Sequence, residues 1–212
     1  MTMTTPLYLF LLVLMSSFAC LAEQPKATPP PCCLKPRGTP TNSSSLSDSS
    51  LYQVESKWTN DNATPITLGT LSGKPQIITM FFASCEYACP LLVHDMQQIE
   101  KALPPELRSK VNFTLVSFDT ERDTPKVLNT YRTTHHLGTN WTLLRGNSDD
   151  VLELAALLGV KFKKDARGQF AHSNVITLLN GKGEIISQQI GLNRDPASTV
   201  VAVQKLLKGS AD

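Results

Sequence analysis

The sequence has little net charge and no excess of one sign. Its 20 Lys and Arg residues face 18 Asp and Glu residues, which leaves a formal charge of +2 at pH 7. Nothing in this balance indicates a nucleic-acid surface or an acidic substrate. Cysteines are also few, with five in 212 residues, whereas a disulfide scaffold has a higher density of them. No internal repeat is present.

The sequence also lacks a long apolar run at its amino terminus. Residues 7–18 are apolar, but about 12 residues fall short of the roughly 20 that a membrane span requires. Small residues follow at 19–22, as in an export signal, although residues 1–5 contain no Lys or Arg. We predict a signal peptide over residues 1–22, cleaved after Ala22. An uncleaved short membrane anchor or lipid attachment at Cys20 are the alternatives, and all three place the protein outside the cytoplasm.

Residues 23–50 have the composition of a linker. The segment is rich in Pro and Ser, and such a segment cannot bury enough apolar surface to order itself. Cys32 and Cys33 lie within it. We interpret them as exposed thiols or incidental disulfides rather than as a functional relay.

Residues 51–212 carry the periodic patterns of one folded domain. Alternation predicts a strand at 51–58, which forms an N-terminal hairpin with a short strand or turn at 66–71. Further segments follow from apolar patterns, caps and turn residues. The predicted strands are 76–82, 111–118, 141–144, 174–179 and 184–190, and the predicted helices are 90–103, 125–135, 149–158 and one from Asp195-Pro196 onward. Residues 161–169 are interpreted as a polar, basic connection, and residues 180–183 as a hairpin turn.

This order predicts an α/β, thioredoxin-like fold with an N-terminal β-hairpin and an inserted strand–helix segment. Alternating strands and helices favour a mostly parallel sheet that is covered on both faces. Ligands of such sheets bind beyond the carboxyl ends of the strands. Cys85 and Cys89 follow the strand at 76–82, so they are expected at that end.

The two cysteines form a C-x-x-x-C motif. Pro90 suits the first turn of a helix and disfavours helical geometry at the residue before it. We therefore expect Cys89 at or just before a helix N-terminus, where free N–H groups and the helix dipole favour thiolate. Two thiols at this position can perform redox chemistry or hold a soft metal. A simple stabilising disulfide is the structural alternative.

His172 is the candidate third member of this site. It precedes the strand at 174–179, at a connection where thioredoxin-like folds carry a cis-proline, and no proline occurs from Gly168 to Asn180. An imidazole facing two thiols gives two sulfur ligands and one nitrogen ligand. Thiolates select soft ions such as Cu(I), and imidazole accommodates either copper oxidation state. Structural zinc requires a fourth ligand, for which only Asp119 is apparent.

Four ordered segments resemble the SCO/SenC family of copper chaperones. Residues 80–90, M-F-F-A-S-C-E-Y-A-C-P, are similar to the copper motif of that family. Residues 117–125, S-F-D-T-E-R-D-T-P, are similar to its S-x-D-P-E-R-D-T-P segment, with Thr120 in place of the usual proline. Residues 141–144 and His172-Ser173 follow in matching order, and residues 51–55 fit the opening strand. The resemblance covers about residues 51–207.

The resemblance implies a periplasmic or membrane-tethered protein that binds copper, as Cu(I) or Cu(II), through Cys85, Cys89 and His172. It implies a role in assembling the dinuclear copper site of cytochrome c oxidase, by delivering copper or by keeping cysteines reduced. The implied partners are the copper-site subunit of the oxidase or another copper chaperone. Asp119 would lie near the site and orient a ligand or a partner contact.

A second function stays open at this point. An extracytoplasmic thiol–disulfide oxidoreductase would use Cys85 and Cys89 as its catalytic pair, so whether the protein is an enzyme is undecided. A peroxidase of related fold would need a lone activated cysteine, and the paired motif argues against it. His94, His135 and His136 are interpreted as surface or helix-end residues without a metal.

Overall fold

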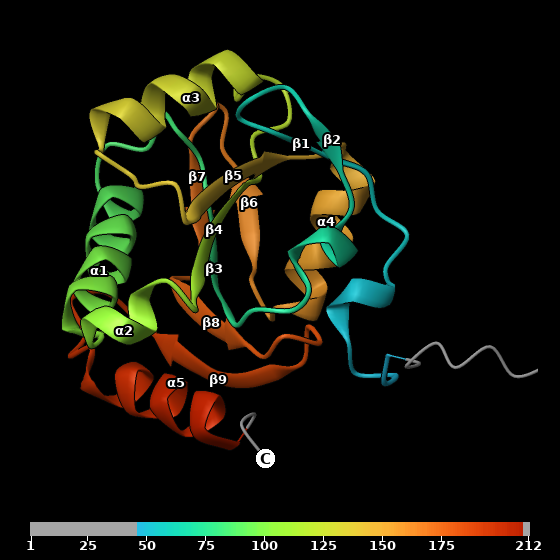
Figure 1. Ribbon diagram of the computed structural model, residues 1–212. Coiled ribbons are helices and arrows are strands. Elements are labelled where there is room, and N and C mark those ends of the chain that lie inside the picture. The colour runs from blue at the N-terminus through green and yellow to red at the C-terminus, as the bar shows by residue number, and fades with distance from the viewer. Residues whose placement is uncertain (1–45, 210–212) are drawn as a thin grey trace, which may run out of the picture. The chain divides into compact units, whose positions relative to one another are not determined.

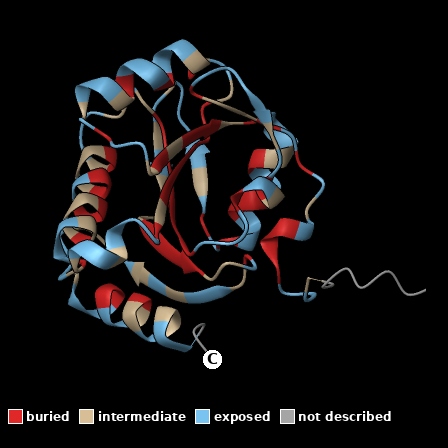
Figure 2. Ribbon diagram, in the orientation of Figure 1, coloured by how far each residue is buried: buried red, intermediate tan, exposed pale blue. Residues whose placement is uncertain are grey.

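Three parallel strands form the centre of the fold (Figure 1). They are β3 (Gln76–Phe81), β4 (Asn112–Ser117) and β5 (Trp141–Arg145). The computed structural model describes residues 46–209, within the second of two compact units of the chain, Ser43–Asp212. The predicted signal peptide, most of the predicted linker, and Cys20, Cys32 and Cys33 lie outside the described residues. Every residue of β3 is buried (Figure 2), as its nearly continuous apolar sequence indicates.

Antiparallel strands extend the sheet on both sides. Its order is β2-β1-β5-β4-β3-β8-β9, and only β3–β4 and β4–β5 are parallel. The added strands are β1 (Trp58–Asn60), β2 (Pro65–Ile66), β8 (Val175–Leu179) and β9 (Ile185–Ile190). The prediction of a mostly parallel sheet is therefore wrong. Each edge of the sheet is a hairpin, and a tight turn can join only antiparallel strands.

The N-terminal hairpin is confirmed, but its first strand begins later than predicted. Residues 51–53 form a 3-10 helix, η1 (Leu51–Gln53), instead of a strand. The Ser50 hydroxyl caps it by accepting a hydrogen bond from Tyr52 N at 3.1 Å. Leu51 and Tyr52 are both buried, which a helical turn permits and a half-buried strand does not. The hairpin is made by β1 and β2, and a second 3-10 helix, η2 (Leu68–Leu71), follows.

Helices lie on both sides of the sheet (Figure 1). Within residues 46–209 the α-helices are α1 (Ala88–Ala102), α2 (Pro105–Arg108), α3 (Pro125–Thr134), α4 (Ser148–Leu157) and α5 (Ala197–Gly209). Thr124 caps α3 as predicted, with Pro125 at its first position. The cap of α4 is Asn147 rather than Ser148, because the Asn147 side chain accepts the N–H of Asp150. The short α2 was not predicted. None of the described helices has the length and apolar character needed to cross a lipid bilayer.

The segment predicted as a polar, basic connection contains two strands, which form a second, two-stranded sheet within residues 161–172. Its strands are β6 (Phe162–Lys164) and β7 (Phe170–His172), which pair antiparallel. Asp165 stabilises the turn by accepting the N–H groups of Arg167 and Gln169, each at 2.8 Å. The strands were not predicted because the lysines at 161, 163 and 164 obscure the alternation of apolar and polar residues in this segment. We call residues 161–172 the basic hairpin.

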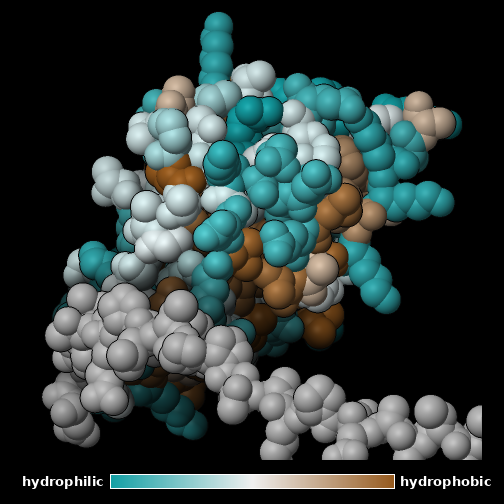
Figure 3. Space-filling model, turned by 90° about the vertical axis from the view of Figure 1, so that its right-hand side faces the viewer, coloured by the Kyte–Doolittle hydropathy of each residue, from teal (hydrophilic) through white to brown (hydrophobic). Residues whose placement is uncertain are grey.

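The start of the described chain lies at the end of the sheet opposite the carboxyl ends of β3 and β4. Leu179 pairs with Gln76 at the start of β3, so the predicted hairpin turn at 180–183 lies at that end. Leu51 N donates to Gly183 O at 3.0 Å, and the Ser50 hydroxyl donates to Lys182 O at 2.5 Å. The upper part of the face in Figure 3 is largely hydrophilic, and apolar side chains gather mainly below and to the right of its centre. The chain thus enters the fold away from the cysteine end.

Candidate functional site

The site begins where β3 ends. The strand carries the chain out of the core through Phe82, and the loop from Ala83 to Tyr87 follows. Cys85 N donates to Phe82 O at 3.2 Å, which closes a turn. Cys85 is half-buried at the surface of this loop, whereas Cys89 is fully buried. The loop therefore presents one accessible sulfur above one enclosed sulfur.

Cys89 lies inside the first turn of α1, not before it. The helix begins at Ala88 with Tyr87 as its N-cap, so the predicted start at Pro90 is two residues too late. Proline disfavours helical geometry before it without forbidding it, and here Pro90 still falls in the first turn. The N–H of Cys89 donates to Cys85 Sγ at 3.3 Å. The free donor at the helix N-terminus thus acts on Cys85 rather than on Cys89 itself.

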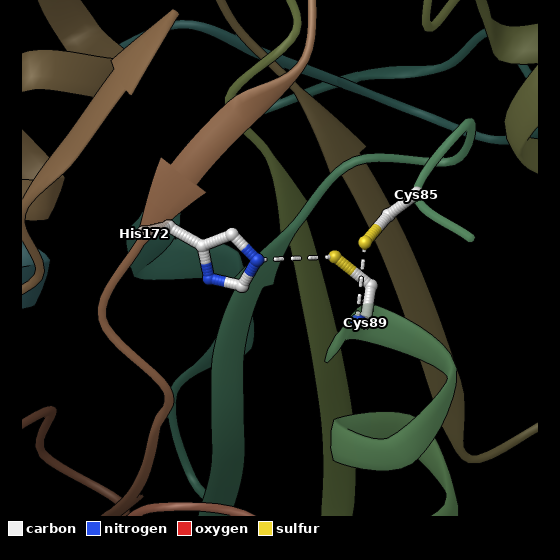
Figure 4. Close-up of side chains that lie close together, drawn as sticks. All are labelled: Cys85, Cys89 and His172. Atoms are coloured by element: carbon white, nitrogen blue, oxygen red, sulfur yellow. Dashed lines mark hydrogen bonds between the residues drawn. The ribbon is translucent and has the colours of Figure 1, made fainter. Parts of the chain in front are cut away.

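Cys85, Cys89 and His172 come together as the sequence predicted (Figure 4). One ligand atom from each lies within 4.8 Å of the others. Cys89 Sγ lies 3.5 Å from His172 Nε2. Among residues 46–209, they form the one group of three or more His, Cys, Asp or Glu side chains so placed. His172 ends β7, which brings it from the basic hairpin to the end of α1 that holds the cysteines.

Burial raises the pKa of the Cys89 thiol well above its usual range. A hydrogen bond with the Phe82 backbone acts in the opposite direction, and the neighbouring Cys85 adds to the rise. Burial therefore opposes the thiolate that we expected the helix N-terminus to favour at Cys89, because it desolvates the charged form. Cys89 keeps its proton until a metal or another electrophile displaces it.

The ring of His172 has a defined tautomer. Nδ1 lies 3.2 Å from Ser173 O. A carbonyl oxygen can only accept, so Nδ1 carries the hydrogen. Nε2 is then left with its lone pair facing Cys89 Sγ. Burial also lowers the pKa of His172, with the Ser173 contact opposing, which keeps the ring neutral and able to bind a metal near pH 7.

An aromatic cluster holds the His172 ring in place. The ring lies 5.2 Å from that of Phe118 and 6.2 Å from that of Phe82, between centroids. Phe118 also stacks on Phe162 at 5.1 Å, and Phe170 packs on both Phe118 and Phe82. We call Phe82, Phe118, Phe162 and Phe170 the aromatic cluster. Sequence reasoning missed it, since its members are far apart in sequence. The pairing of β3 with β4 brings Phe82 beside Phe118, and the pairing of β6 with β7 brings Phe162 beside Phe170.

Asp123 fixes the start of the cysteine loop. Its Oδ2 accepts the N–H of Ala83 at 2.9 Å and the hydroxyl of Ser117 at 2.5 Å. The residue is buried, and burial raises the pKa of its carboxyl while the two hydrogen bonds lower it. The carboxyl therefore joins the ends of β3 and β4 beneath the loop. Its motif was recognised in the sequence, but this role was not.

Asp119 does not join the cluster of ligands. It is buried and forms an ion pair with Arg122, whose guanidinium also donates to Gly168 O. Gly168 lies in the turn of the basic hairpin. Asp119 is therefore connected, through Arg122, to the turn of the basic hairpin.

Tyr131 is a second residue near the thiols that sequence reasoning did not assign. It lines an open hollow of about 390 Å³ together with Ala83, Val127 and other residues of α3. Its hydroxyl is buried without a hydrogen-bond partner among the described residues. Burial raises its pKa, and the two cysteines add to the rise when they are ionised. Its apolar spacing on α3 indicated only a core residue.

The remaining histidines do not join the Cys-Cys-His cluster. His94 is exposed on α1 and contacts Gln98, with 3.0 Å between the two side-chain nitrogens. The His135 ring stacks on Tyr131 with 4.0 Å between centroids. None of the three belongs to a metal-binding group of the described residues.

The fold and site define a thioredoxin-like protein with a Cys-Cys-His cluster at the carboxyl ends of its central strands. The SCO1/SenC family model matches residues 46–208. Because this match covers most of the sequence, the chain belongs to the SCO1/SenC family.

Known proteins agree with this assignment. A candidate copper-binding protein of Stutzerimonas stutzeri is 28% identical over 130 residues, which are 59% of this chain and 63% of that protein. The match thus spans less than two thirds of that relative. The copper-bound structure of ScoI from Bradyrhizobium japonicum has a TM-score of 0.61 at 24% identity, over 71% of this chain and 96% of that one. A SCO1/SenC family lipoprotein from Bacillus anthracis has a TM-score of 0.66 at 22% identity, over 71% and 92%.

Proposed function

We propose that this protein is a copper chaperone that carries one copper ion on Cys85, Cys89 and His172. The observation that supports this most is the convergence of two sulfurs and one ring nitrogen within 4.8 Å of one another. Copper is the cargo in this proposal rather than a resident cofactor.

The donor set fits copper better than zinc. Two cysteine sulfurs and one imidazole suit Cu(I), and imidazole also accommodates Cu(II). A structural zinc site requires a fourth ligand, and the described residues supply none within the group. Asp119, the one fourth ligand that the sequence suggested, is engaged by Arg122. The lone pair of His172 Nε2 faces the sulfurs, so no change of tautomer is required.

The different exposure of the two sulfurs suits transfer to another protein. Cys89 is enclosed, and Cys85 is half-buried on the loop. An incoming thiolate would reach the metal beside Cys85, and Cys89 and His172 would be released last. Ligand exchange of this kind needs only a small, transient interface.

The proposed recipient is the copper-site subunit of cytochrome c oxidase or another copper chaperone. The Sco family is described as a family of cytochrome c oxidase assembly proteins, and the sequence resemblance supports the same role. We also propose an extracytoplasmic location, periplasmic, secreted or membrane-anchored, with residues 1–22 as signal or tether and residues 23–50 as linker. The lipoprotein among the structural relatives supports anchoring.

The proposal is tested by Cu(I) binding to the reduced full chain without oxygen, with Cys20, Cys32 and Cys33 replaced by Ser. We expect one tightly bound equivalent, lost in Cys85→Ser. His172→Ala should weaken affinity more than tenfold, because even outer-shell partners of a metal contribute about 10- to 100-fold. His94→Ala is the matched control and should bind as the parent does. Equal binding by His172→Ala and the parent would contradict the proposed site.

A second function is favoured by the accessible Cys85 above the buried Cys89. In a thiol–disulfide oxidoreductase, the Cys85 thiolate attacks a target disulfide and expels one of its sulfurs as a thiol. Cys89 then loses its proton, attacks the mixed disulfide, and releases the second target thiol as the Cys85–Cys89 disulfide forms. This reaction does not require His172. Reduction of a disulfide substrate that survives His172→Ala, with no copper bound by the parent, would support the oxidoreductase instead.

A further inference from the structure

The basic hairpin concentrates positive charge in a protein that is almost neutral. Residues 161–172 contain Lys161, Lys163, Lys164 and Arg167 against Asp165 alone, whereas the whole chain has a net charge of only +2. The proposed copper site uses only His172 from this segment. The charge of the hairpin therefore has no role in the function described so far.

Three of these cations are free to meet a partner. Lys164 is already neutralised, because its Nζ lies 2.6 Å from the Glu121 carboxylate. Asp165 points its carboxylate at the turn N–H groups. By contrast, Lys161, Lys163 and Arg167 are exposed and form no ion pair within residues 46–209.

The strand register places Lys161 and Lys163 on the outer side of the hairpin at the strand positions next to His172, whereas Arg167 lies in the turn at its other end. Phe162 pairs with His172 and Lys164 with Phe170, so all four lie on one face of the hairpin. This is the inner face, from which Phe162 and Phe170 complete the aromatic cluster. Lys163 pairs with Ala171 on the opposite, outer face. Lys161 O accepts the N–H of Ser173 at 2.8 Å, which places Lys161 next to His172 across the hairpin.

We propose that the outer face of the basic hairpin docks an acidic protein surface that flanks the thiol or copper site of the partner. This inference rests on the proposed exchange at Cys85 and specifies the kind of partner that it serves. Free charges next to a reactive group raise the rate of encounter with an oppositely charged partner and fix its orientation. The Debye length of about 8 Å at physiological salt keeps this effect local to the hairpin end of the molecule.

A protein partner fits this charge better than a membrane or a nucleic acid. Lipid-binding basic segments use clusters of about four to eight Lys or Arg residues, and the hairpin leaves three free. The whole chain lacks the strong basic bias of a nucleic-acid binder. A reactive thiol on the same end of the molecule also requires a protein, rather than a lipid, to approach.

The test measures how fast the reduced protein reacts with charged peptides in the absence of copper. Three ten-residue peptides carry one cysteine and four Glu, four Gln or four Lys, and each cysteine forms a mixed disulfide with thionitrobenzoate. The Cys85 thiolate attacks the peptide sulfur and releases yellow thionitrobenzoate, whose absorbance gives the rate. Cys89 then releases the peptide thiol as the Cys85–Cys89 disulfide forms. The full chain carries Ser at 20, 32 and 33, and Cys85→Ser gives the background rate.

We expect the acidic peptide to react roughly tenfold faster than the basic one at low ionic strength. This ratio should approach one at high salt, because screening removes it. A triple variant, Lys161→Glu with Lys163→Glu and Arg167→Glu, should reverse the preference, and the corresponding Gln triple should abolish it.

The matched control is Lys110→Glu with Lys205→Glu and Lys208→Glu. It changes the net charge of the protein by the same amount. Lys110 lies two residues before the start of β4, at the end of the sheet away from the cysteines, and Lys208 lines the same hollow as Lys110. The control should keep the preference for the acidic peptide.

Four outcomes would overturn the docking proposal. The first is that the hairpin and control variants show the same ratio of rates with the acidic and basic peptides. The second and third are that the parent reacts equally fast with all peptides, or no faster than Cys85→Ser. The fourth is that the parent shows no peptide preference but binds phosphatidylserine vesicles through the hairpin. The assay contains no copper, so a protein that binds no copper still tests the hairpin. Normal copper binding without peptide discrimination would contradict the docking surface alone.

Discussion

At the scale of single residues, burial and hydrogen-bond partners set the protonation of the side chains in the site. Cys89 is enclosed and keeps its proton, and His172 is neutral with its lone pair directed at Cys89. Asp123 is the least expected of these groups. It is a buried carboxyl that connects the loop at Ala83 with the end of β4 at Ser117.

Asp123 should make the stability of the metal-free protein depend on pH. Burial raises the pKa of its carboxyl above the ordinary value, so the folded state holds this proton more tightly than the unfolded state. The stabilising contribution is therefore fully present below the unfolded pKa of about 3.9 and is lost as pH rises through the folded pKa. Asn at this position cannot titrate.

Denaturant unfolding of the parent and Asp123→Asn from pH 4 to pH 7 measures this contribution. The free energy of unfolding of the parent minus that of the variant should be largest near pH 4 and decrease toward pH 7. A difference that is constant over this range, or that grows with pH, would show that Asp123 does not have a raised pKa.

At the scale of elements, the position of His172 is decided by the packing of the basic hairpin on the sheet. The two-stranded β6–β7 unit contributes Phe162 and Phe170, which pack against Phe118 at the end of β4. His172 leaves β7 against the same side chains. The hairpin is therefore a support that aims one ligand, as well as a charged surface.

Replacing Phe118 should weaken the contribution of His172 to copper binding. Phe118→Leu removes the ring that contacts His172 and Phe162, so the imidazole is less restrained. We expect a roughly tenfold loss of Cu(I) affinity, the size typical of outer-shell partners. Alkylation of Cys85 by iodoacetamide should change less than about twofold, since the cysteine loop is not altered.

The control for this variant is Phe113→Leu. Phe113 is equally buried and stacks on Trp141 with 4.8 Å between centroids, among residues that do not belong to the ligand group. Both variants should lose about 1–2 kcal/mol of stability from the change in core shape. A similar loss of copper affinity in both would show that the effect is general destabilisation.

At the scale of the whole molecule, one ion pair connects three separate parts of the chain. Arg132 on α3 binds both carboxylate oxygens of Asp61, which follows β1. The same guanidinium donates to the carbonyls of Gly138 and Trp141 at the start of β5, each at 2.7 Å. The side chain of Asp61 is 1% exposed. The N-terminal hairpin is thus tied to the central sheet by a buried charge.

Replacing one partner of this ion pair should destabilise the protein more than replacing both partners. Arg132→Met leaves the Asp61 carboxylate buried and unpaired, which we expect to cost about 3–5 kcal/mol in the free energy of unfolding. Adding Asp61→Asn removes that charge and should recover part of the loss. Urea unfolding of the two single variants and the double variant forms the thermodynamic cycle. Strictly additive losses would argue against a coupled pair.

Most elements of the main sheet, and the three residues of the proposed metal site, could be predicted from the sequence alone. Apolar runs located β3, β4 and β8, and caps and prolines located the helices to within a few residues, because these signals are local. The C-x-x-x-C motif and the missing proline before β8 identified Cys85, Cys89 and His172. Chemistry carried by single side chains can be recognised without a structure.

How those groups behave depends on tertiary packing, which the sequence did not reveal. Burial makes Cys89 a protonated thiol despite its place at a helix N-terminus, because desolvation depends on neighbours that are distant in sequence. The pairing of β6 with β7, the aromatic cluster beneath His172 and the contacts of Asp123 are likewise long-range. The mixed sheet was missed for the same reason, since strand direction depends on which strands become neighbours. Local sequence patterns specify whether a segment forms a helix or a strand. Packing between segments sets the protonation of the site residues, the side chains that hold them in place and the charges around them.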